Sequence, residues 1–329
     1  MPPIRFGIIG LGRIAEKFAQ TIRDCDIGAV VTAASSHNAE RAREFAGTYG
    51  VASHYASYDE MLADSGRFDA VYIANTNEKH YACCLAGIEA GKHILCEKPL
   101  VLTAGQARDL KQKATNRGVF LMEAIWSRFL PAHQKAVQWA LDGKIGKLRG
   151  VSATFCIQRE LEKSSRIFSP ALGGGSLYDI GIYCLQLIQL VTKGRTLQDV
   201  RALNIPSGFG AEISNYVHLL YDDGFVADFK CSFGCRAPNE AHITGTGGYI
   251  TIAPFFNHAQ CVRLFTAPAG SGVYSPAPDE VFLQQAASGF EFEIMHMVEC
   301  IQKGLPESPI CPLDDSIELA MLMERILNK

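Results

Sequence analysis

Short apolar segments alternate with longer segments of helical spacing between Ile4 and about Leu121. The apolar segments are rich in Val, Ile and Ala, a composition typical of buried parallel strands. The strands that we predict are Arg5–Ile9, Ala29–Ala34, Ala70–Ala74, His93–Cys96 and Val119–Met122. The helices that we predict are Arg13–Asp24, Ala39–Tyr49, Tyr58–Ser65, Glu78–Ala90 and Ala104–Arg117. The predicted fold class is therefore α/β, with a doubly wound parallel (Rossmann) sheet in an N-terminal domain over residues 1–124.

The pattern changes after Gly146, where apolar and polar residues alternate and glycine-rich turns separate the segments. A period of two indicates antiparallel strands with one buried face. The strands that we predict here are Val151–Cys156, Asn215–Leu220, Phe225–Phe233, His242–Thr246 and Tyr249–Ile252. The helices that we predict are Leu177–Val191, Phe290–Gln302 and Asp314–Leu327. We therefore expect a C-terminal α+β domain over residues 125–329 with an open, mostly antiparallel sheet. The alternative that its last helices pack on the first domain stays open.

The length and charge of the chain narrow the possible functions. Its 329 residues are too many for one ordinary hydrophobic core, which agrees with two domains. Hydrophobic residues make up 48% and charged residues 20%, as in a packed globular protein. With 31 Lys and Arg against 34 Asp and Glu, the formal net charge of -3 provides no basic surface for nucleic acid or an anionic membrane. We therefore expect a small-molecule partner.

The first residues lack the charged and apolar layout of a secretory signal, and no apolar run has the length of a membrane span. We therefore expect a cytoplasmic location. The 11 cysteines include no Cys-x-x-Cys pair, so the sequence predicts neither a disulfide framework nor a metal site. We expect most of them to be reduced and buried.

A glycine-rich turn follows the first predicted strand and opens the first predicted helix. Its sequence, Gly-Leu-Gly-Arg-Ile-Ala over residues 10–15, has the spacing of a dinucleotide-binding fingerprint. The first glycine permits the tight turn, the second lets the backbone approach a pyrophosphate, and the N–H groups at the helix start face the phosphates. The predicted cofactor contacts in this turn are Gly10, Leu11, Gly12, Arg13 and Ile14.

The end of the second predicted strand bears on the choice of nucleotide. NAD-binding domains usually carry an acidic residue there for the ribose 2′-hydroxyl, but no acid occurs here before Glu40. Ser36, His37 and Arg41 offer hydrogen-bond donors or positive charge to a 2′-phosphate instead. We predict a preference for NADP, with use of NAD also open. The structural alternative is that Ser36 caps the next helix and Arg41 lies on a solvated face.

Two segments far apart in the sequence carry the candidate catalytic groups. Glu97 and Lys98 end the fourth predicted strand, at the sheet edge where doubly wound folds bind ligands, and Pro99 makes a fixed turn with a cis bond plausible. An ordinary surface ion pair would also account for adjacent Glu and Lys. The second segment is a glycine-rich helix entry in which Asp179 and Tyr183 are four residues apart and share a helical face. There Asp179 could orient or tune Lys98, while Tyr183 could exchange a proton with a substrate oxygen.

Together with the fingerprint and the Glu97-Lys98-Pro99 turn, this helix entry makes the sequence similar to the Gfo/Idh/MocA family of oxidoreductases, over nearly the whole chain. Residues 122–131 and 291–309 resemble its branch of dimeric trans-dihydrodiol dehydrogenases and NADP-dependent D-xylose dehydrogenases. The resemblance implies that Lys98, Asp179 and Tyr183 are catalytic, with Tyr183 at a position where many relatives carry His. This branch often has Arg in place of His37, so the phosphate site departs from its pattern.

The resemblance also implies roles for residues between these segments: a cofactor path after the third predicted strand, the nicotinamide end, and the pocket wall. The cofactor contacts so implied are Asn75, Thr76, Asn77, His80, Glu97, Lys98, Trp126 and Arg128. The implied substrate contacts are Lys98, Trp126, Asp179 and Tyr183. By residue type alone, purely structural roles stay open for three of them, in which His80 caps its helix, Trp126 is a core aromatic and Arg128 forms a solvent-exposed ion pair.

The predicted function is NAD(P)-dependent hydride transfer between a nicotinamide and a secondary or hemiacetal hydroxyl of a sugar, cyclic polyol or trans-dihydrodiol. The alternatives are an NAD-dependent inositol-type dehydrogenase and a non-catalytic dinucleotide-binding sensor. We also expect a homodimer through the second-domain sheet, because Val226, Phe229 and Phe233 suggest an apolar face that needs a partner.

Overall fold

A computed structural model describes residues 1–162, 165–252, 255–268 and 276–328 of the chain. The chain divides into two compact units. The first unit consists of Met1–Trp126 and Ala287–Ala320, and the second of Ser127–Ala286 and Met321–Lys329. The chain thus leaves the first unit after Trp126, returns to it at Ala287 and ends in the second unit.

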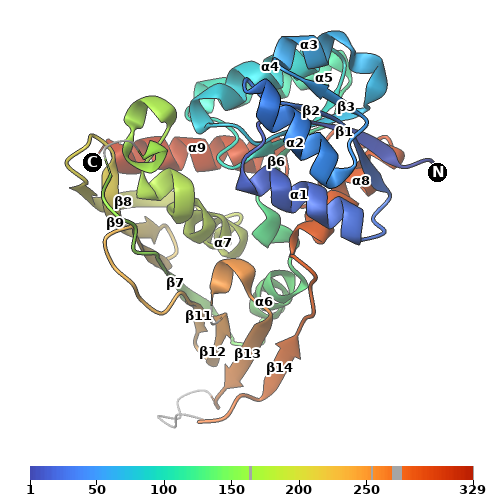
Figure 1. Ribbon diagram of the computed structural model, residues 1–329. Coiled ribbons are helices and arrows are strands. Elements are labelled where there is room, and N and C mark those ends of the chain that lie inside the picture. The colour runs from blue at the N-terminus through green and yellow to red at the C-terminus, as the bar shows by residue number, and fades with distance from the viewer. Residues whose placement is uncertain (163–164, 253–254, 269–275, 329) are drawn as a thin grey trace. The chain divides into compact units, whose positions relative to one another are not determined.

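The first unit contains a six-stranded parallel sheet with strand order β3-β2-β1-β4-β5-β6 (Figure 1). The strands are β1 (Ile4–Ile9), β2 (Ala29–Ser35), β3 (Ser53–Tyr55), β4 (Ala70–Ile73), β5 (His93–Glu97) and β6 (Leu121–Ala124). The strand order reverses direction between β1 and β4. In open parallel sheets the crevice at the carboxyl ends of two such strands is where ligands bind.

Helices cover both faces of this sheet, with α4 and α5 packed together and α1 against α8 (Figure 1). The helices are α1 (Arg13–Asp24), α2 (Ala39–Tyr49), α3 (Tyr58–Ala63), α4 (His80–Glu89), α5 (Ala104–Arg117), α8 (Phe290–Gln302) and the start of α9 (Leu313–Leu327). All four residues of β4 are buried, as expected for a strand covered on both faces. The ring of Tyr72 in β4 stacks on Phe18 of α1, with centroids 3.8 Å apart.

The second unit contains an eight-stranded open sheet with strand order β14-β13-β12-β11-β7-β10-β9-β8. The strands are β7 (Leu148–Cys156), β8 (Leu197–Pro206), β9 (Glu212–Tyr221), β10 (Val226–Ser232), β11 (Ala241–Gly245), β12 (Gly248–Ile252), β13 (Cys261–Thr266) and β14 (Glu280–Leu283). Only the pairing of β7 with β10 is parallel among these neighbours. The predicted fold class, a Rossmann sheet followed by an open and mostly antiparallel sheet, is therefore confirmed.

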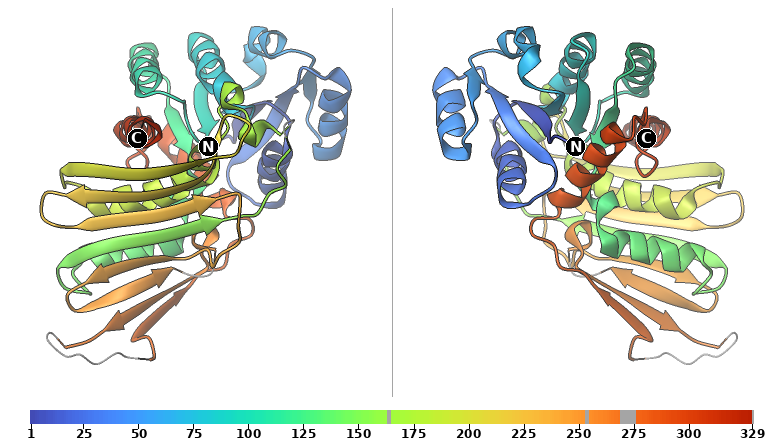
Figure 2. Two further views of the ribbon diagram at one scale, coloured as in Figure 1. Left: turned by 90° about the vertical axis from the view of Figure 1, so that its left-hand side faces the viewer. Right: turned by 90° about the vertical axis from the view of Figure 1, so that its right-hand side faces the viewer.

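Helices α6 (Pro131–Leu141) and α7 (Ile182–Thr192) lie on one face of this sheet (Figure 2). Within the described residues, the opposite face carries no α-helix. Alternation along β10 buries Phe229 on the helix-covered face, whereas Val226 on the open face is 41% exposed. Phe233, just after the strand, is also fully buried. Our expectation that Phe229 and Phe233 belong to an exposed apolar face is therefore wrong, because both contribute to the core of their own unit.

Several elements differ from the sequence-based predictions. The strands β3, β8 and β14 were not predicted. Each is an edge strand, which has a neighbouring strand on one side only, and its apolar pattern is weak. The strand β13 and helix α6, which begins with Pro131, were also not predicted. Strand β6 begins at Leu121 and not at Val119, where we predicted it. The amide of Val119 instead donates a hydrogen bond to the carbonyl of Ala114 in α5.

The helices fit the predicted positions more closely than the edge strands do. The predicted helix over residues 78–90 begins as a 3₁₀ turn, Asn77–Lys79, before α4. The helix predicted from Leu177 begins with a π-helical turn, Leu177–Gly181, before α7. In the described part of the chain, no helix combines the length and the hydropathy needed to cross a membrane.

Candidate functional site

The turn after β1 has the geometry of a phosphate cradle. Gly10 has a φ of 87°, and a Cβ atom added there would lie 2.7 Å from the backbone nitrogen of Asn75. A Cβ at Gly12 would meet no atom within 4 Å, so the backbone there stays open to an approaching group. Gly12 is the N-cap of α1, and no side chain caps this helix start within the described residues. The open helix N-terminus fits the pyrophosphate of a dinucleotide.

The residues after β2 form a local turn at the position expected for the adenosine ribose. The hydroxyl of Ser36 accepts a hydrogen bond from the amide of Asn38 at 3.2 Å. Asn38 in turn caps α2 by accepting a bond from the amide of Arg41. His37 is exposed and its ring lies 4.2 Å from that of Tyr58. No acidic side chain precedes Glu40 in this turn.

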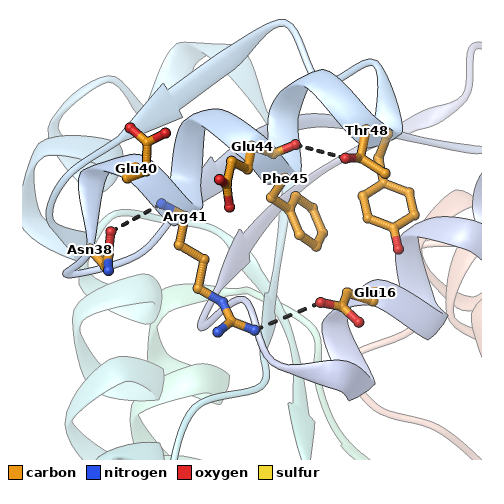
Figure 3. A pocket seen from close by; sticks show the side chains of 8 residues that line it. Glu16, Asn38, Glu40, Arg41, Glu44, Phe45 and Thr48 are labelled. Atoms are coloured by element: carbon orange, nitrogen blue, oxygen red, sulfur yellow. Dashed lines mark hydrogen bonds and ion pairs between the residues drawn. The ribbon is translucent and has the colours of Figure 1, made fainter.

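Arg41 links helix α2 to the glycine-rich turn. Its Nε donates to the carbonyl oxygen of Leu11, and its guanidinium lies 3.7 Å from the carboxylate of Glu16 in α1 (Figure 3). These side chains border a cleft of about 440 Å³. The lining residues are Glu16, Asn38, Glu40, Arg41, Glu44, Phe45, Thr48 and Tyr49. Arg41 is therefore not a simple solvated residue, since it contacts the backbone of the predicted cradle.

The segment after β4 is fixed by a buried imidazole. The ring nitrogens of His80 lie 2.8 Å from the carbonyl oxygen of Pro99 and 3.3 Å from that of Asn75. Burial lowers the pKa of His80 to about 4, despite its two carbonyl contacts, so the ring is neutral at pH 7. His80 thus connects the segments that follow β4 and β5. Nearby, Asn75 donates to the sulfur of Cys83 and Thr76 donates to Glu78.

Strand β5 ends with the pair Glu97 and Lys98, and the Lys98–Pro99 peptide bond is cis. Glu97 is 8% exposed, and its carboxylate accepts a 2.6 Å hydrogen bond from the hydroxyl of Tyr72. Lys98 is half-buried. The amide of Leu100 donates to the carboxylate of Glu123. A surface ion pair therefore does not describe Glu97, because its carboxylate is held inside the sheet by a buried phenol.

A buried charge cluster beside Glu97 was not predicted from the sequence. The ammonium of Lys17 in α1 lies 4.9 Å from the ring centre of Trp126 and 4.4 Å from that of Phe290. Burial lowers the pKa of Lys17, although the carboxyl groups of Glu293 and Glu97 oppose this shift. Glu293 of α8 is fully buried, and neither of its oxygens has a hydrogen-bond partner among the described residues. Burial, followed by repulsion from Glu97, raises its pKa well above the usual value.

In the second unit, Asp179 and Tyr183 lie on either side of the change from π-helical to α-helical structure. π-Helical turns are rare and often occur at functional sites. The carboxylate of Asp179 lies 3.4 Å from the guanidinium of Arg166. The ring of Tyr183 is 8% exposed and packs edge-on against Phe155 of β7, with centroids 5.7 Å apart.

Glu212 of β9 holds the start of this helix and was also missed. Its carboxylate accepts a 2.9 Å hydrogen bond from the amide of Leu177. A Cβ at Gly175, where φ is 130°, would lie 2.3 Å from this carboxylate. The lack of a side chain at Gly175 therefore lets the carboxylate of Glu212 pack closely against the glycine-rich turn. Burial raises the pKa of Glu212. An isolated Glu at the start of a strand carries no sequence signal for this role.

Arg128 is buried in the second unit and donates to the side chain of Gln189 in α7. Its exposure of 1% excludes a solvent-exposed ion pair. Trp126, 6% exposed, is packed in the first unit against Phe290.

The predicted site residues are thus divided between the units. The first unit carries Gly10, Leu11, Gly12, Arg13, Ile14, Ser36, His37, Arg41, Asn75, Thr76, Asn77, His80, Glu97, Lys98 and Trp126. Those up to Lys98 cluster at or just beyond the carboxyl ends of β1, β2, β4 and β5. The second unit carries Arg128, Asp179 and Tyr183.

Comparison with known proteins identifies the family. Residues 4–125 match the family model described as an oxidoreductase family with an NAD-binding Rossmann fold, and residues 133–251 match the Gfo/Idh/MocA C-terminal domain. The chain belongs to the Gfo/Idh/MocA oxidoreductase family. Among its relatives, trans-1,2-dihydrobenzene-1,2-diol dehydrogenase of Bos taurus is 33% identical over 98% of this chain and 96% of its own. The Homo sapiens enzyme of that name is 30% identical over 98% of this chain and 96% of its own.

Solved structures agree with this assignment. The aldose-aldose oxidoreductase of Caulobacter crescentus, complexed with glycerol, has a TM-score of 0.87 and 26% identity, covering 99% of this chain and 97% of its own. A 3-ketoreductase of Actinomadura kijaniata, in complex with NADP and TDP-benzene, has a TM-score of 0.86 at 24% identity, covering 99% of this chain and 97% of its own. The second likeness shows a shared fold. This oxidoreductase therefore carries an NAD-binding Rossmann domain.

The buried acid Glu293 should make the stability of this oxidoreductase depend on pH. Because its folded pKa is raised, the unfolded state releases this proton first, and stability falls as pH rises from about 4.5 toward the folded pKa. Each unit of pKa shift corresponds to about 1.4 kcal/mol. Glu293→Gln keeps a neutral group of similar shape, so its melting temperature relative to wild type should increase between pH 5 and pH 8.

The matched control is Glu299→Gln on the same helix, since Glu299 is exposed and its hydrogen bond and ion pair with Lys303 lower its pKa. Its melting temperature relative to wild type should not increase over this range. A difference between Glu293→Gln and wild type that stays constant with pH would mean that Glu293 is ionised in the folded protein.

Proposed function

We propose that this protein is an NADP-preferring dehydrogenase that acts on a CH–OH group of a sugar or a trans-dihydrodiol. The observation that carries the proposal is the position of Lys98, directly after Glu97 at the end of β5 and in the same unit as the open cradle at Gly12. A cationic group at this edge suits a reaction in which a substrate hydroxyl loses a proton. The 30–33% identity to named dihydrodiol dehydrogenases over nearly the whole chain supports the substrate class.

The proposed reaction divides the work among a few side chains. When bound, the nicotinamide accepts or donates the hydride. Tyr183 takes the hydroxyl proton, and the ammonium of Lys98 stabilises the negative charge that develops on the substrate oxygen. Asp179 is the acid of the same proposed catalytic group. Glu97, held by Tyr72, fixes the turn that carries Lys98 and borders the nicotinamide end.

The proposed preference for NADP rests on charge at the end of β2. No acid is present there to bind a ribose 2′-hydroxyl or to repel a 2′-phosphate. Arg41 lies against Leu11 of the cradle, within reach of a phosphate at this position, with Ser36 and His37 as further donors. Glu16 competes for the same guanidinium. The NAD-dependent inositol-type dehydrogenase and the non-catalytic sensor remain the rival functions, and turnover of a panel of sugars and diols with both nucleotides separates all three.

The catalytic assignment predicts that loss of Lys98 lowers the rate of turnover and leaves the affinity for the cofactor nearly unchanged. Lys98→Met should lower kcat by about 10²- to 10⁴-fold, the usual effect of losing a positioned proton-transfer or charge-stabilising group. The dissociation constant for NADPH should change only a few-fold, because Gly10, Gly12 and α1 are untouched. Tyr183→Phe should lower kcat within the same range. Steady-state kinetics and NADPH fluorescence titration measure the two quantities.

The control is Lys147→Met, which changes an exposed lysine just before β7 and should retain wild-type kinetics. Turnover by Lys98→Met within a few-fold of wild type would refute the assignment of Lys98.

The cofactor assignment predicts that Arg41→Ala weakens NADP(H) and spares NAD(H). Loss of a charged hydrogen bond to a phosphate should raise the dissociation constant for NADPH by about 10- to 100-fold. Glu16→Gln should tighten NADPH binding by releasing Arg41, and His37→Asp should reverse the preference by repelling the phosphate. Arg43→Ala is the control, since Arg43 is exposed on the same helix and paired with Glu40. Equal losses for both nucleotides in Arg41→Ala would contradict a 2′-phosphate contact.

We further propose that the protein is a homodimer through the open face of the second-unit sheet. This face presents Leu220 opposite Val226 and Leu203 opposite Tyr216, all between 39% and 59% exposed. Exposed apolar pairs on a face without a helix are favourable to cover with a second copy of the same face.

Light scattering at micromolar concentration should therefore give the mass of a dimer, and Leu220→Lys should shift it toward a monomer. Leu141→Lys, at another exposed leucine on α6, should leave the dimer intact. A monomeric wild-type protein with full activity would exclude this dimer.

A further inference from the structure

Two thiols of the second unit form a pair that the proposed reaction does not use. Cys156 is the last residue of β7 and is 3% exposed, whereas Cys235 lies after β10 and is only partly buried. Their side chains lie close enough for each thiol to affect the pKa of the other. All 11 cysteines are free thiols in the structure. The pair therefore combines a partly exposed thiol with a buried one near it.

The backbone holds the segment that carries Cys235 against Cys156. Ser232 is the register partner of Cys156, and its carbonyl accepts a 2.9 Å bond from the amide of Ile157. Further along, the side chain of Asn239 accepts from the amide of Cys156 at 2.8 Å and donates to its carbonyl at 3.2 Å. The segment between residues 232 and 239 is thus attached to the end of β7 at both ends, so Cys235 stays near Cys156.

The charges around the pair make the two thiols unequal. Burial raises the pKa of Cys235, but hydrogen bonds from Ser232 and Cys156 and the ammonium of Lys230 outweigh it and leave the pKa below its usual value. Burial raises the pKa of Cys156. Lys230 lies opposite Tyr216 of the neighbouring strand, with its ammonium 5.5 Å from the centre of that ring. Cys235, the more exposed and more acidic thiol, is therefore suited to act as the nucleophile, and the buried Cys156 as the resolving thiol.

We propose that Cys235 and Cys156 form a dithiol site that hydroperoxides oxidise to a disulfide. The thiolate of Cys235 attacks the peroxide oxygen, so that a sulfur–oxygen bond forms, the oxygen–oxygen bond breaks, and the peroxide leaves as an alcohol or water after taking up a proton. The sulfur of Cys156 then attacks the sulfenic acid of Cys235, the disulfide forms, and the hydroxyl leaves as water with the thiol proton of Cys156. Two thiols and one hydroperoxide thus give one disulfide, one water and one alcohol or second water.

The test is peptide mapping of the full-length reduced protein after brief treatment with hydrogen peroxide and alkylation of the remaining thiols. The expected product is a cross-linked pair of peptides containing Cys156 and Cys235, two hydrogens lighter than the separate thiols and reversed by a thiol reductant. Cys156→Ser should leave a sulfenic acid on Cys235 that dimedone traps. Cys235→Ser should leave Cys156 unoxidised, and Lys230→Met should slow disulfide formation several-fold at pH 7.

Cys261→Ser removes another half-exposed cysteine of the same sheet and should leave the Cys156–Cys235 product unchanged. The wild-type result alone decides the proposal if a variant fails to fold. Absence of the cross-linked peptides in treated wild type, or equal oxidation of Cys156 in Cys235→Ser, would overturn it. These masses do not depend on turnover or on the nucleotide, so the outcome is separate from that of the proposed function.

Discussion

The close approach of Gly10 to the start of the segment after β4 is the constraint on which the first unit depends. The backbone nitrogen of Asn75 lies 2.7 Å from where a Cβ of residue 10 would be, so only glycine allows these two strand ends to lie at this separation. This approach occurs at the reversal of strand order between β1 and β4. Because the turn is tight, α1 starts with its N-terminus uncapped and facing the crevice. The cradle, the Arg41 contact with Leu11 and the His80 bridge all depend on this geometry.

Buried carboxyl groups in this protein are stabilised in different ways, and the difference follows from backbone donors. Glu291 accepts hydrogen bonds from three successive amides, of Ala287, Ser288 and Gly289, and these outweigh burial and lower its pKa. Glu293, two residues later on the same helix, has no such donors, so burial raises its pKa. The backbone donors thereby favour the ionised form of Glu291 at the start of α8, whereas burial and the neighbouring Glu97 favour the protonated form of Glu293. The number of donors, and not the depth of burial alone, decides the direction of the pKa shift.

In the second unit, strand β7 supports the proposed catalytic tyrosine and also carries one thiol of the cysteine pair. Along β7, Phe155 faces the helix-covered side and packs on Tyr183, while Cys156 faces the thiol of Cys235. Glu212 of β9 supports the π-helical turn from below through Leu177. The residues proposed for proton transfer are therefore supported by the core of the sheet and not by their helix alone.

The sequence by itself determined the Rossmann order of elements, the fingerprint turn, the buried strands and the change to an alternating sheet, because these depend on local periodicity and on glycine geometry. It could not determine the edge strands β3, β8 and β14, whose pairing on one side leaves little apolar pattern. The tertiary structure alone decided that Phe229 and Phe233 face the core, that Lys17 lies against two aromatic rings, and that Glu212 holds the start of the helix that carries Tyr183. Such features depend on which face of a strand is covered and on contacts between residues far apart along the chain. Local sequence patterns contain no information on either.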